Sequence, residues 1–270
     1  MLVAENAAAV IKARESGLHQ PSNAGHQIGA FKLWMDGSFG SCTALMKEPF
    51  TDEPSKSGIL MDEPDEIYKK MVDAHTAGLQ LAVESIGDES SRICLELFDR
   101  LLKEHPKHDH RHRVEHASIL DKSLIKEFSR LHLVASVQPM FLDSEKNWLH
   151  KRLGAERAKW TYPFRSMMKG GIIMSGSSDA PIEMMDVLHA IQCCVTREGF
   201  ETQEAMDAED ALKMFTLNAA FAQFQEGVRG SLATGKRADL VILEENPLKV
   251  PSNEIKNIPI LETICGGSTV

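Results

Sequence analysis

The sequence predicts an α/β protein with a parallel β-sheet, followed by a small β-rich region. Two observations lead to this prediction. Short apolar runs alternate with longer amphipathic stretches over residues 30–224, and glycine-punctuated, β-rich sequence follows residue 225. Near-continuous apolar strands that alternate with helices are typical of parallel strands covered by helices. The chain has 270 residues, 43% of them hydrophobic, which is enough to bury a sizeable core.

Five apolar runs predict the strands of the sheet. They are Ala30–Met35, Leu79–Val83, Arg113–His116, Leu131–Gln138 and Gly171–Ser175. The amphipathic stretches predict helices, several of which open with Asp, Ser or Pro as N-cap or first-turn residues. These helices are expected over Asp62–Ala77, Ser90–Glu104, Asp121–Leu131, Tyr162–Lys169, Asp186–Glu198 and Ala208–Phe224.

The end of the chain has a different character. Val228–Asn246 contains a β-rich run, Asp239–Leu243, and Ile264–Val270 is again short and punctuated by glycine. We therefore expect a main domain over residues 1–224 and a β-rich appendage over residues 225–270.

The number of strands leaves two architectures open. A closed (β/α) barrel has eight strands, whereas this chain offers five strand–helix units, so either the sheet is open or the front of a barrel is missing. Ala7–Ser16 resembles the end of a helix, and Gly17–Gly29 then leads directly into a strand. This pattern at the start of the sequence favours a barrel that lacks its first strand–helix units. Strands left without neighbours would expose backbone groups, so we expect a homo-oligomer or aggregation rather than a clean monomer.

Composition argues against several classes of protein. Acidic residues (39) outnumber basic ones (30), the net charge is −9, and no basic stripe is visible, which argues against a nucleic-acid partner. No apolar run approaches the roughly 18 residues of a membrane span, so we expect a cytoplasmic protein with no membrane association.

Five cysteines without C-x-x-C spacing are typical of free thiols. The pair Cys193–Cys194 lies in an apolar helical pattern, which favours packing over catalysis.

Four polar residues mark the ends of otherwise apolar strands. They are Lys32, Glu84, His116 and Asp179. In parallel α/β folds the carboxyl ends of the strands converge on the site, so an amine, two carboxylates and an imidazole are expected to share one pocket. Each residue alone also has a structural interpretation: Glu84 or Asp179 as a helix cap, His116 as a hydrogen-bonded core histidine, and Lys32 as half of an ion pair.

The segments around these residues resemble consecutive blocks of the amidohydrolase superfamily, in the branch of the N-substituted formamide deformylases. The blocks follow the family order over nearly the whole chain. They are Lys32–Gly40 (KLWMDGSFG), Glu84–Asp88 (ESIGD), Arg111–His116 (RHRVEH), Ser136–Pro139 (SVQP), Gly176–Glu183 (GSSDAPIE) and Gly230–Leu243 (GSLATGKRADLVIL). The resemblance implies a metal-dependent (β/α)8 barrel, here with about strands four to eight, plus part of a composite β-sandwich.

The same resemblance implies roles for the four residues. Lys32, Glu84, His116 and Asp179 would end barrel strands four, five, six and eight and would bind a divalent metal, expected to be zinc. Lys32 is expected to be carboxylated, because a neutral lysine amine can capture carbon dioxide and become an anionic oxygen ligand. Asp179 is the expected catalytic base, which takes the proton of a water that zinc has acidified to a pKa of about 7.

Two departures from the family pattern bear on activity. The family has a histidine ligand where this chain has Glu84, and a carboxylate would make the bound water less acidic. The family's first-strand His-x-His pair has no counterpart upstream of Lys32. The segment His108–His112 (HDHRH) has similar spacing but follows a polar stretch, and we do not expect it to be a barrel metal site.

These observations favour one function and leave a second open. The first is a metal-dependent amidohydrolase that acts on a non-peptide carbon–nitrogen bond, an amide or formamide, of a small-molecule substrate, although we expect this chain to be inactive by itself. The second is a truncated or inactive homologue with a binding or regulatory role. The substrate-binding residues cannot be read, because loops set specificity on this fold.

Overall fold

The structure is a computed structural model that describes residues 7–13, 15 and 29–270. The chain divides into two compact units, Met1–Ala135 and Ser136–Val270. One sheet has five strands in the order β1–β2–β3–β4–β5, and a second sheet has three strands. Strand β1 is parallel to β2, and β2 is parallel to β3. This arrangement confirms the predicted α/β class with a parallel sheet in sequence order.

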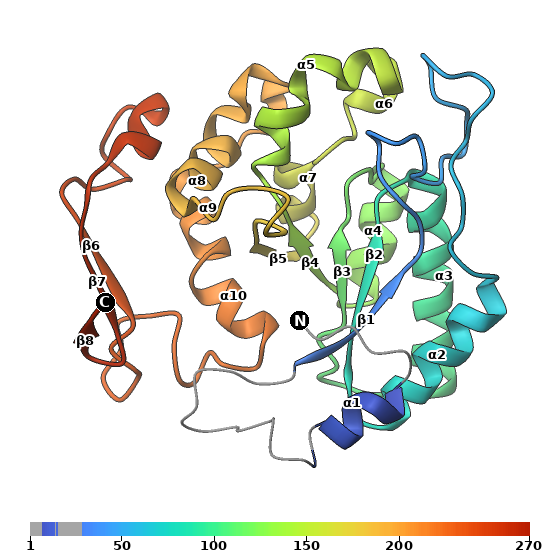
Figure 1. Ribbon diagram of the computed structural model, residues 1–270, viewed down its shortest axis with the longest axis horizontal. Helices are drawn as coiled ribbons and strands as arrows, with labels where there is room; N and C mark the ends of the chain where they lie inside the picture. The colour runs from blue at the N-terminus through green and yellow to red at the C-terminus, as the bar shows by residue number, and fades with distance from the viewer. Residues whose placement is uncertain (1–6, 14, 16–28) are drawn as a thin grey trace. The chain divides into compact units, whose positions relative to one another are not determined.

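In the first unit, helices α2 and α3 pack against strand β2 (Figure 1). Nearly every residue of β1 and β2 is buried, which is why these strands read as continuous apolar runs. The unit's elements are α1 (Ala7–Ala13), β1 (Ala30–Trp34), α2 (Pro64–Thr76), β2 (Gln80–Ser85), α3 (Asp88–Glu104), β3 (Arg113–His116) and α4 (Lys122–Arg130), and β4 (Val134–Val137) begins at its end. The predicted Gly17–Gly29 segment falls almost wholly outside the described residues.

Local sequence signals explain where the helices begin. The Asp121 side chain caps α4 by accepting from the N–H groups of Ser123 and Leu124. Helix α3 begins at Asp88, two residues earlier than predicted, directly after Gly87. A Cβ at Gly87 would lie 1.9 Å from the carbonyl oxygen of Leu45, so only glycine allows this approach of the two chain segments.

A buried carboxylate anchors the long loop that follows β1. Asp36 is 1% exposed. It accepts hydrogen bonds from the N–H groups of Leu45 (2.8 Å), Ile86 (3.0 Å) and Gly87 (2.8 Å), and from the Ser90 hydroxyl (2.7 Å). Burial raises the pKa of Asp36 to about 6, although these four donors lower it. Asp36 therefore ties the end of β1 to the loop, to the end of β2 and to α3.

Histidines form a neutral hydrogen-bonded chain at the start of β2 and β3. The Leu81 N–H donates to His112 Nδ1 (3.0 Å), so His112 carries its proton on Nε2 and donates to His75 Nδ1 (2.8 Å). His75 Nε2 then donates to the His105 carbonyl (2.9 Å). The His112 N–H donates to His110 Nδ1 (3.0 Å). The HDHRH segment therefore contributes His110 and His112 to the packing of the core.

The second unit contains the rest of the chain. Its elements are α5 (Phe141–Leu153), α6 (Ala155–Ala158), α7 (Phe164–Lys169), β5 (Ile173–Gly176), α8 (Val187–Thr196), η2 (Arg197–Gly199), η3 (Thr202–Glu204), α9 (Ala208–Met214), α10 (Leu217–Ala222), β6 (Leu240–Leu243), η4 (Ser252–Asn257), β7 (Ile260–Cys265) and β8 (Ser268–Thr269). Helix α5 was not predicted from the sequence.

The single helix predicted over Ala208–Phe224 is wrong, because the chain forms α9 and α10 with a break between them. Thr216 leaves the helical region, with φ −126° and ψ −95°. The ring of Phe215 lies against Gly176, where an added Cβ would meet ring atoms at 2.3 Å. The break thus seats Phe215 beside the end of β5.

The small sheet pairs β6 with β7 and β7 with β8, all antiparallel (Figure 1). Several of its apolar residues are exposed, among them Val241 (50%) and Leu261 (60%). The sheet lies within the region predicted to be β-rich, and the domain boundary at residue 225 stays a prediction. Within the described residues, no helix combines the length and apolar character that a membrane span requires.

We predict that Asp36→Asn lowers the free energy of unfolding by about 3 kcal/mol, because the amide leaves at least one buried N–H donor without an acceptor. Urea unfolding followed by circular dichroism measures the change. The matched control is Asp121→Asn, since asparagine serves as an N-cap as well as aspartate does. Equal stability of the two variants would contradict the anchoring role of Asp36.

We predict that acid destabilises the folded chain through the buried histidines. Burial lowers the pKa of His112 to about 2 and that of His110 to about 4. The unfolded chain therefore binds more protons below about pH 6.5, and stability falls by up to about 1.4 kcal/mol per pH unit for each histidine. Asp36 acts with the opposite sign, because its pKa is raised.

Comparing variants isolates the histidine contribution. Between pH 6.5 and 5, His112→Asn should show a shallower loss of stability in urea unfolding than the unchanged chain. His108→Asn is the control, since it removes an exposed histidine of the same segment. A slope that is the same in all three proteins would rule out this origin of acid sensitivity.

Candidate metal centre

Three of the four candidate residues meet at one oxygen atom in the first unit. Lys32 on β1 donates from Nζ to Glu84 Oε2 on β2 at 2.7 Å. His116, the last residue of β3, places Nε2 3.5 Å from the same Oε2. The three side chains are only 6%, 16% and 5% exposed, respectively. The sheet thus assembles an amine, a carboxylate and an imidazole in one buried cluster.

Strand register explains why Lys32 and Glu84 share a face. Glu84 lies opposite Trp34, and Lys32 lies two residues before Trp34 on the same strand, so alternation points both charged side chains to one side of the sheet. The Lys32 ammonium also lies 5.4 Å from the centre of the Trp34 ring. Ser85, the next residue of β2, is buried and contacts the Ser90 and Ser91 hydroxyls of α3 instead.

His116 departs from this alternation. It is in register with Ser85, which contacts α3, yet its imidazole reaches Glu84. The backbone of His116 has a φ of 70°, and that of Ala117 has a φ of 47°. Left-handed conformations are uncommon and strained for residues other than glycine, and such strain gathers at functional sites. The end of β3 is therefore shaped in a way that brings the imidazole to the carboxylate.

The charges around Glu84 favour its ionised form. Burial raises the pKa of Glu84, but the hydrogen bond and charge of His116, together with those of Lys32, bring it below its usual value. Glu84 is therefore an anion at neutral pH, with its Oε2 contacted from two sides.

The donor set fits a divalent metal ion. A buried carboxylate and a buried imidazole that contact each other are both common zinc ligands. Lys32, as an ammonium, contacts the same carboxylate oxygen and so competes with a metal for it. Conversion of the amine to a carbamate would remove this positive charge and add an oxygen ligand.

Asp179 lies in the second unit, three residues beyond β5. The segment before it is held to the end of β4, because Ser177 N–H donates to the Val137 carbonyl (2.9 Å) and Gln138 Nε2 donates to Ser177 Oγ (2.9 Å). Asp179 has a φ of 55° and is exposed, and its carbonyl accepts from the N–H of Ile182 (2.9 Å). Lys32, Glu84 and His116 belong to the first unit, so the structure brings together those three.

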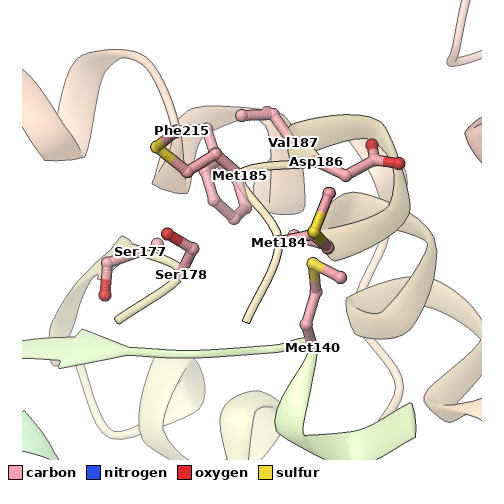
Figure 2. Close-up of a pocket in the computed structure, with 10 residues that line it drawn as sticks. Met140, Ser177, Ser178, Met184, Met185, Asp186, Val187 and Phe215 are labelled. Carbon is pink, nitrogen blue, oxygen red and sulfur yellow. The ribbon is translucent and has the colours of Figure 1, made fainter. Parts of the chain in front are cut away.

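A small apolar pocket lies beside the same segment of the second unit. Its volume is about 210 Å³. Figure 2 shows methionine side chains and the Phe215 ring around it, with the hydroxyls of Ser177 and Ser178 at one side. Its lining residues are Met140, Gly176, Ser177, Ser178, Met184, Met185, Asp186, Val187, Ala190 and Phe215. The pocket suits an apolar group of modest size.

Sequence reasoning missed two polar residues that shape these regions. Asp36 holds the ends of β1 and β2, and Gln138 is buried and holds Ser177. Both follow an apolar strand directly, which is the signal that singled out the four candidates. Their backbone partners are distant along the chain, so the sequence did not indicate what they bind.

The sequence profile of the amidohydrolase family matches residues 3–270. The chain belongs to the amidohydrolase family. It is 32% identical to the putative amidohydrolase YtcJ of Bacillus subtilis (strain 168) over 253 residues, which are 90% of this chain and 47% of YtcJ. It is 27% identical to the N-substituted formamide deformylase of Arthrobacter pascens over 251 residues, 88% of this chain and 45% of that enzyme.

A solved structure supports the same assignment. An uncharacterised metal-dependent hydrolase from Pyrococcus furiosus is 33% identical and superimposes with a TM-score of 0.80, over 90% of this amidohydrolase chain and 50% of the hydrolase. The family resemblance and the partial-barrel fold expected from the sequence are therefore confirmed. The chain spans about half the length of the curated relatives it matches.

We predict that Glu84→Gln destabilises this amidohydrolase chain by about 3 kcal/mol, because it leaves the buried Lys32 ammonium without its counter-charge. Adding Lys32→Met to the same variant should restore part of the loss. Glu96→Gln is the control, since its exposed ion pair with Arg92 should contribute less than about 1 kcal/mol. Urea unfolding measures all three, and a Glu84→Gln effect as small as that of Glu96→Gln would contradict the prediction.

Proposed function

We propose that this chain carries the metal centre of a hydrolase that cleaves a non-peptide carbon–nitrogen bond, an amide or formamide, in a small molecule. The observation that carries the proposal is the meeting of Lys32, Glu84 and His116 at one buried carboxylate oxygen. These residues lie on three neighbouring parallel strands: Lys32 in the middle of β1, Glu84 one residue before the end of β2, and His116 at the end of β3. Catalytic groups of (β/α) barrels gather at the carboxyl ends of the strands. Membership of the amidohydrolase family supports the reaction class.

Four residues have roles in this proposal. Lys32 as a carbamate, Glu84, His116 and Asp179 hold a divalent metal ion, which we propose to be zinc. When bound, zinc lowers the pKa of water to about 7 and polarises a carbonyl oxygen. Asp179 accepts the proton of the attacking water and returns it to the leaving amine. Glu84, in place of the family's histidine, would add a negative charge to the ligands of that ion.

The pocket supports an organic amide as substrate. A curated relative with 27% identity is named an N-substituted formamide deformylase. The pocket beside Ser177 and Ser178 has an apolar lining of thioethers and the Phe215 ring, which suits the substituent on the amide nitrogen. Asp179 directly follows Ser178, so the proposed base is next to this lining in the chain.

The ion pair between Lys32 and Glu84 favours a second candidate function. It satisfies both charges without a metal, so the fold can persist in a chain that performs no hydrolysis. In that case the chain has a binding or regulatory role and keeps only the family's architecture.

The proposed function is tested with the chain supplied with Zn²⁺ and bicarbonate: it requires that the chain binds zinc and hydrolyses at least one member of a panel of N-substituted formamides. Asp179→Asn should lower kcat/KM by at least about 100-fold, because the proton of the attacking water then has no acceptor. Metal content by atomic emission and amine release by a colorimetric assay are the measurements.

The control is Asp207→Asn, which neutralises an exposed carboxylate of the same unit that makes no capping hydrogen bond. This variant should keep full activity. Zinc that is bound by the unchanged chain and lost in His116→Ala, without turnover of any amide, would overturn the proposed substrate class. Zinc content that does not change in His116→Ala, together with absence of turnover, would support the second candidate.

A further inference from the structure

A second group of potential metal ligands lies on and after helix α8. His189 and Cys193 are four residues apart and so share one face of the helix, and Glu198 follows just beyond its end. One ligand atom from each residue lies within 4.8 Å of the others. Among the residues that the structure describes, these three form the one group of histidine, cysteine and acidic side chains whose ligand atoms all lie this close together.

The donor atoms of this group are shielded from water. Cys193 is fully buried. His189 Nε2 is sealed from solvent and makes no hydrogen bond to any described residue, which is costly for a buried polar atom. It lies 3.4 Å from Asp143 Oδ2 on α5. An imidazole nitrogen without a hydrogen bond, beside a thiol and two carboxylates, points to a missing cationic partner.

The turn after α8 is built to present Glu198. Arg197 and Glu198 both have left-handed conformations, with φ of 58° and 47°. The buried guanidinium of Arg197 donates to the carbonyls of Tyr162 (2.6 Å), Thr161 (3.1 Å) and Phe200 (3.2 Å), which fixes the turn. Strain of this kind persists only where the surrounding contacts enforce it.

The rest of Glu198 is also held in place. Its Oε1 accepts from Gln192 Nε2 (3.0 Å) and Thr196 Oγ1 (3.1 Å). Its Oε2 faces Lys146 at 3.6 Å, a long contact for an ion pair. Lys146 instead makes its close contact with Asp143 Oδ1 (2.6 Å). One oxygen of each carboxylate is therefore closely engaged, while Glu198 Oε2 has the long contact with Lys146 and Asp143 Oδ2 lies 3.4 Å from His189 Nε2.

The charges of this region suit a divalent cation. Asp143 and Glu198 are anions, and Lys146 supplies one positive charge beside them, with Lys256 acting on Asp143 from η4. Burial, together with the charges of Glu198 and Asp143, raises the pKa of the Cys193 thiol to about 12. A divalent ion would reverse this effect, since a coordinated thiol loses its proton.

We propose that Cys193 Sγ, His189 Nε2 and the Glu198 carboxylate bind a zinc-class divalent transition-metal ion, with Asp143 as the fourth ligand. On binding, the thiol proton leaves to solvent as the sulfur–metal bond forms, and no electron is transferred. Three anionic ligands then balance the ion and Lys146. Sulfur, nitrogen and oxygen together select this class of ion over calcium or magnesium.

The distances require a small contraction. Ligand atoms around tetrahedral zinc are roughly 3–4 Å apart, given bonds of about 2.0–2.3 Å. The donor atoms here, at up to 4.8 Å, need to close by about 1 Å, which side-chain rotation supplies. The bound ion would fasten α5 to α8 and to the turn at η2. This site is separate from Lys32, Glu84, His116 and Asp179, and it does not depend on the proposed hydrolysis.

Cobalt(II) is the probe, because it substitutes for zinc and gives an intense near-ultraviolet charge-transfer band only when a thiolate is bound. The titration uses the full chain in a Cys265→Ser background, which removes the exposed cysteine. The band should appear in this background and in Asp179→Asn, and it should vanish in Cys193→Ser. Cys194→Ser is the matched control, because it removes the neighbouring, equally buried thiol and should keep the band.

A second pair of variants keeps the Cys193 thiol, so it tests the site even if Cys193→Ser fails to fold. His189→Ala and Glu198→Gln should each weaken cobalt binding by at least about tenfold, since loss of even an outer contact of a metal ligand costs that much. A band that persists in Cys193→Ser, or that is lost equally in Cys194→Ser, would overturn the proposal. So would folded chain that shows no thiolate band at saturating cobalt.

Discussion

The carboxylate of Asp36 is the contact on which the arrangement of the first unit depends. It accepts from the loop after β1 and, about 50 residues further along the chain than Asp36, from the turn after β2 and the first turn of α3, so these segments meet at two oxygen atoms. Lys32 lies on β1, four residues before Asp36, and Glu84 lies on β2, directly before the turn that supplies two of the donors. Both residues of the candidate centre are thus on strands whose ends the same anchor fixes. A buried charge is costly, and here four hydrogen bonds offset that cost.

The candidate centre links the charge of Lys32 to the binding of a cation. As an ammonium, Lys32 stabilises the Glu84 carboxylate directly. As a carbamate it would repel Glu84 unless a cation lay between the two. In the proposed centre, carboxylation and cation binding would therefore favour each other thermodynamically, and an ammonium would oppose both. By linkage, the supply of metal and carbon dioxide would set the balance between the two states.

The five strands could be predicted, because a strand that is buried on both faces consists of consecutive apolar residues. Helices that begin with a capping aspartate, at Asp121 and Asp186, could be predicted as well. Helix α5 lacks such a cap and was missed, and the break at Thr216 depends on a tertiary contact of Phe215. The pattern of polar residues near strand ends indicated Lys32, Glu84 and His116, and their roles stay a prediction. Asp36 also directly follows an apolar strand, but its partners are mainly backbone groups far along the chain, so the sequence did not indicate what it binds.

The buried Arg197 has a consequence for how this sequence can change over evolution. All three of its acceptors are main-chain carbonyls, which every amino acid possesses. The side chains at Thr161, Tyr162 and Phe200 can therefore drift, within the limits of packing, without removing an acceptor. Arg197 itself has no such latitude, since lysine lacks the planar fork that reaches several oxygens at once. Selection on this turn would thus fall on one position, while its surroundings accumulate neutral variation.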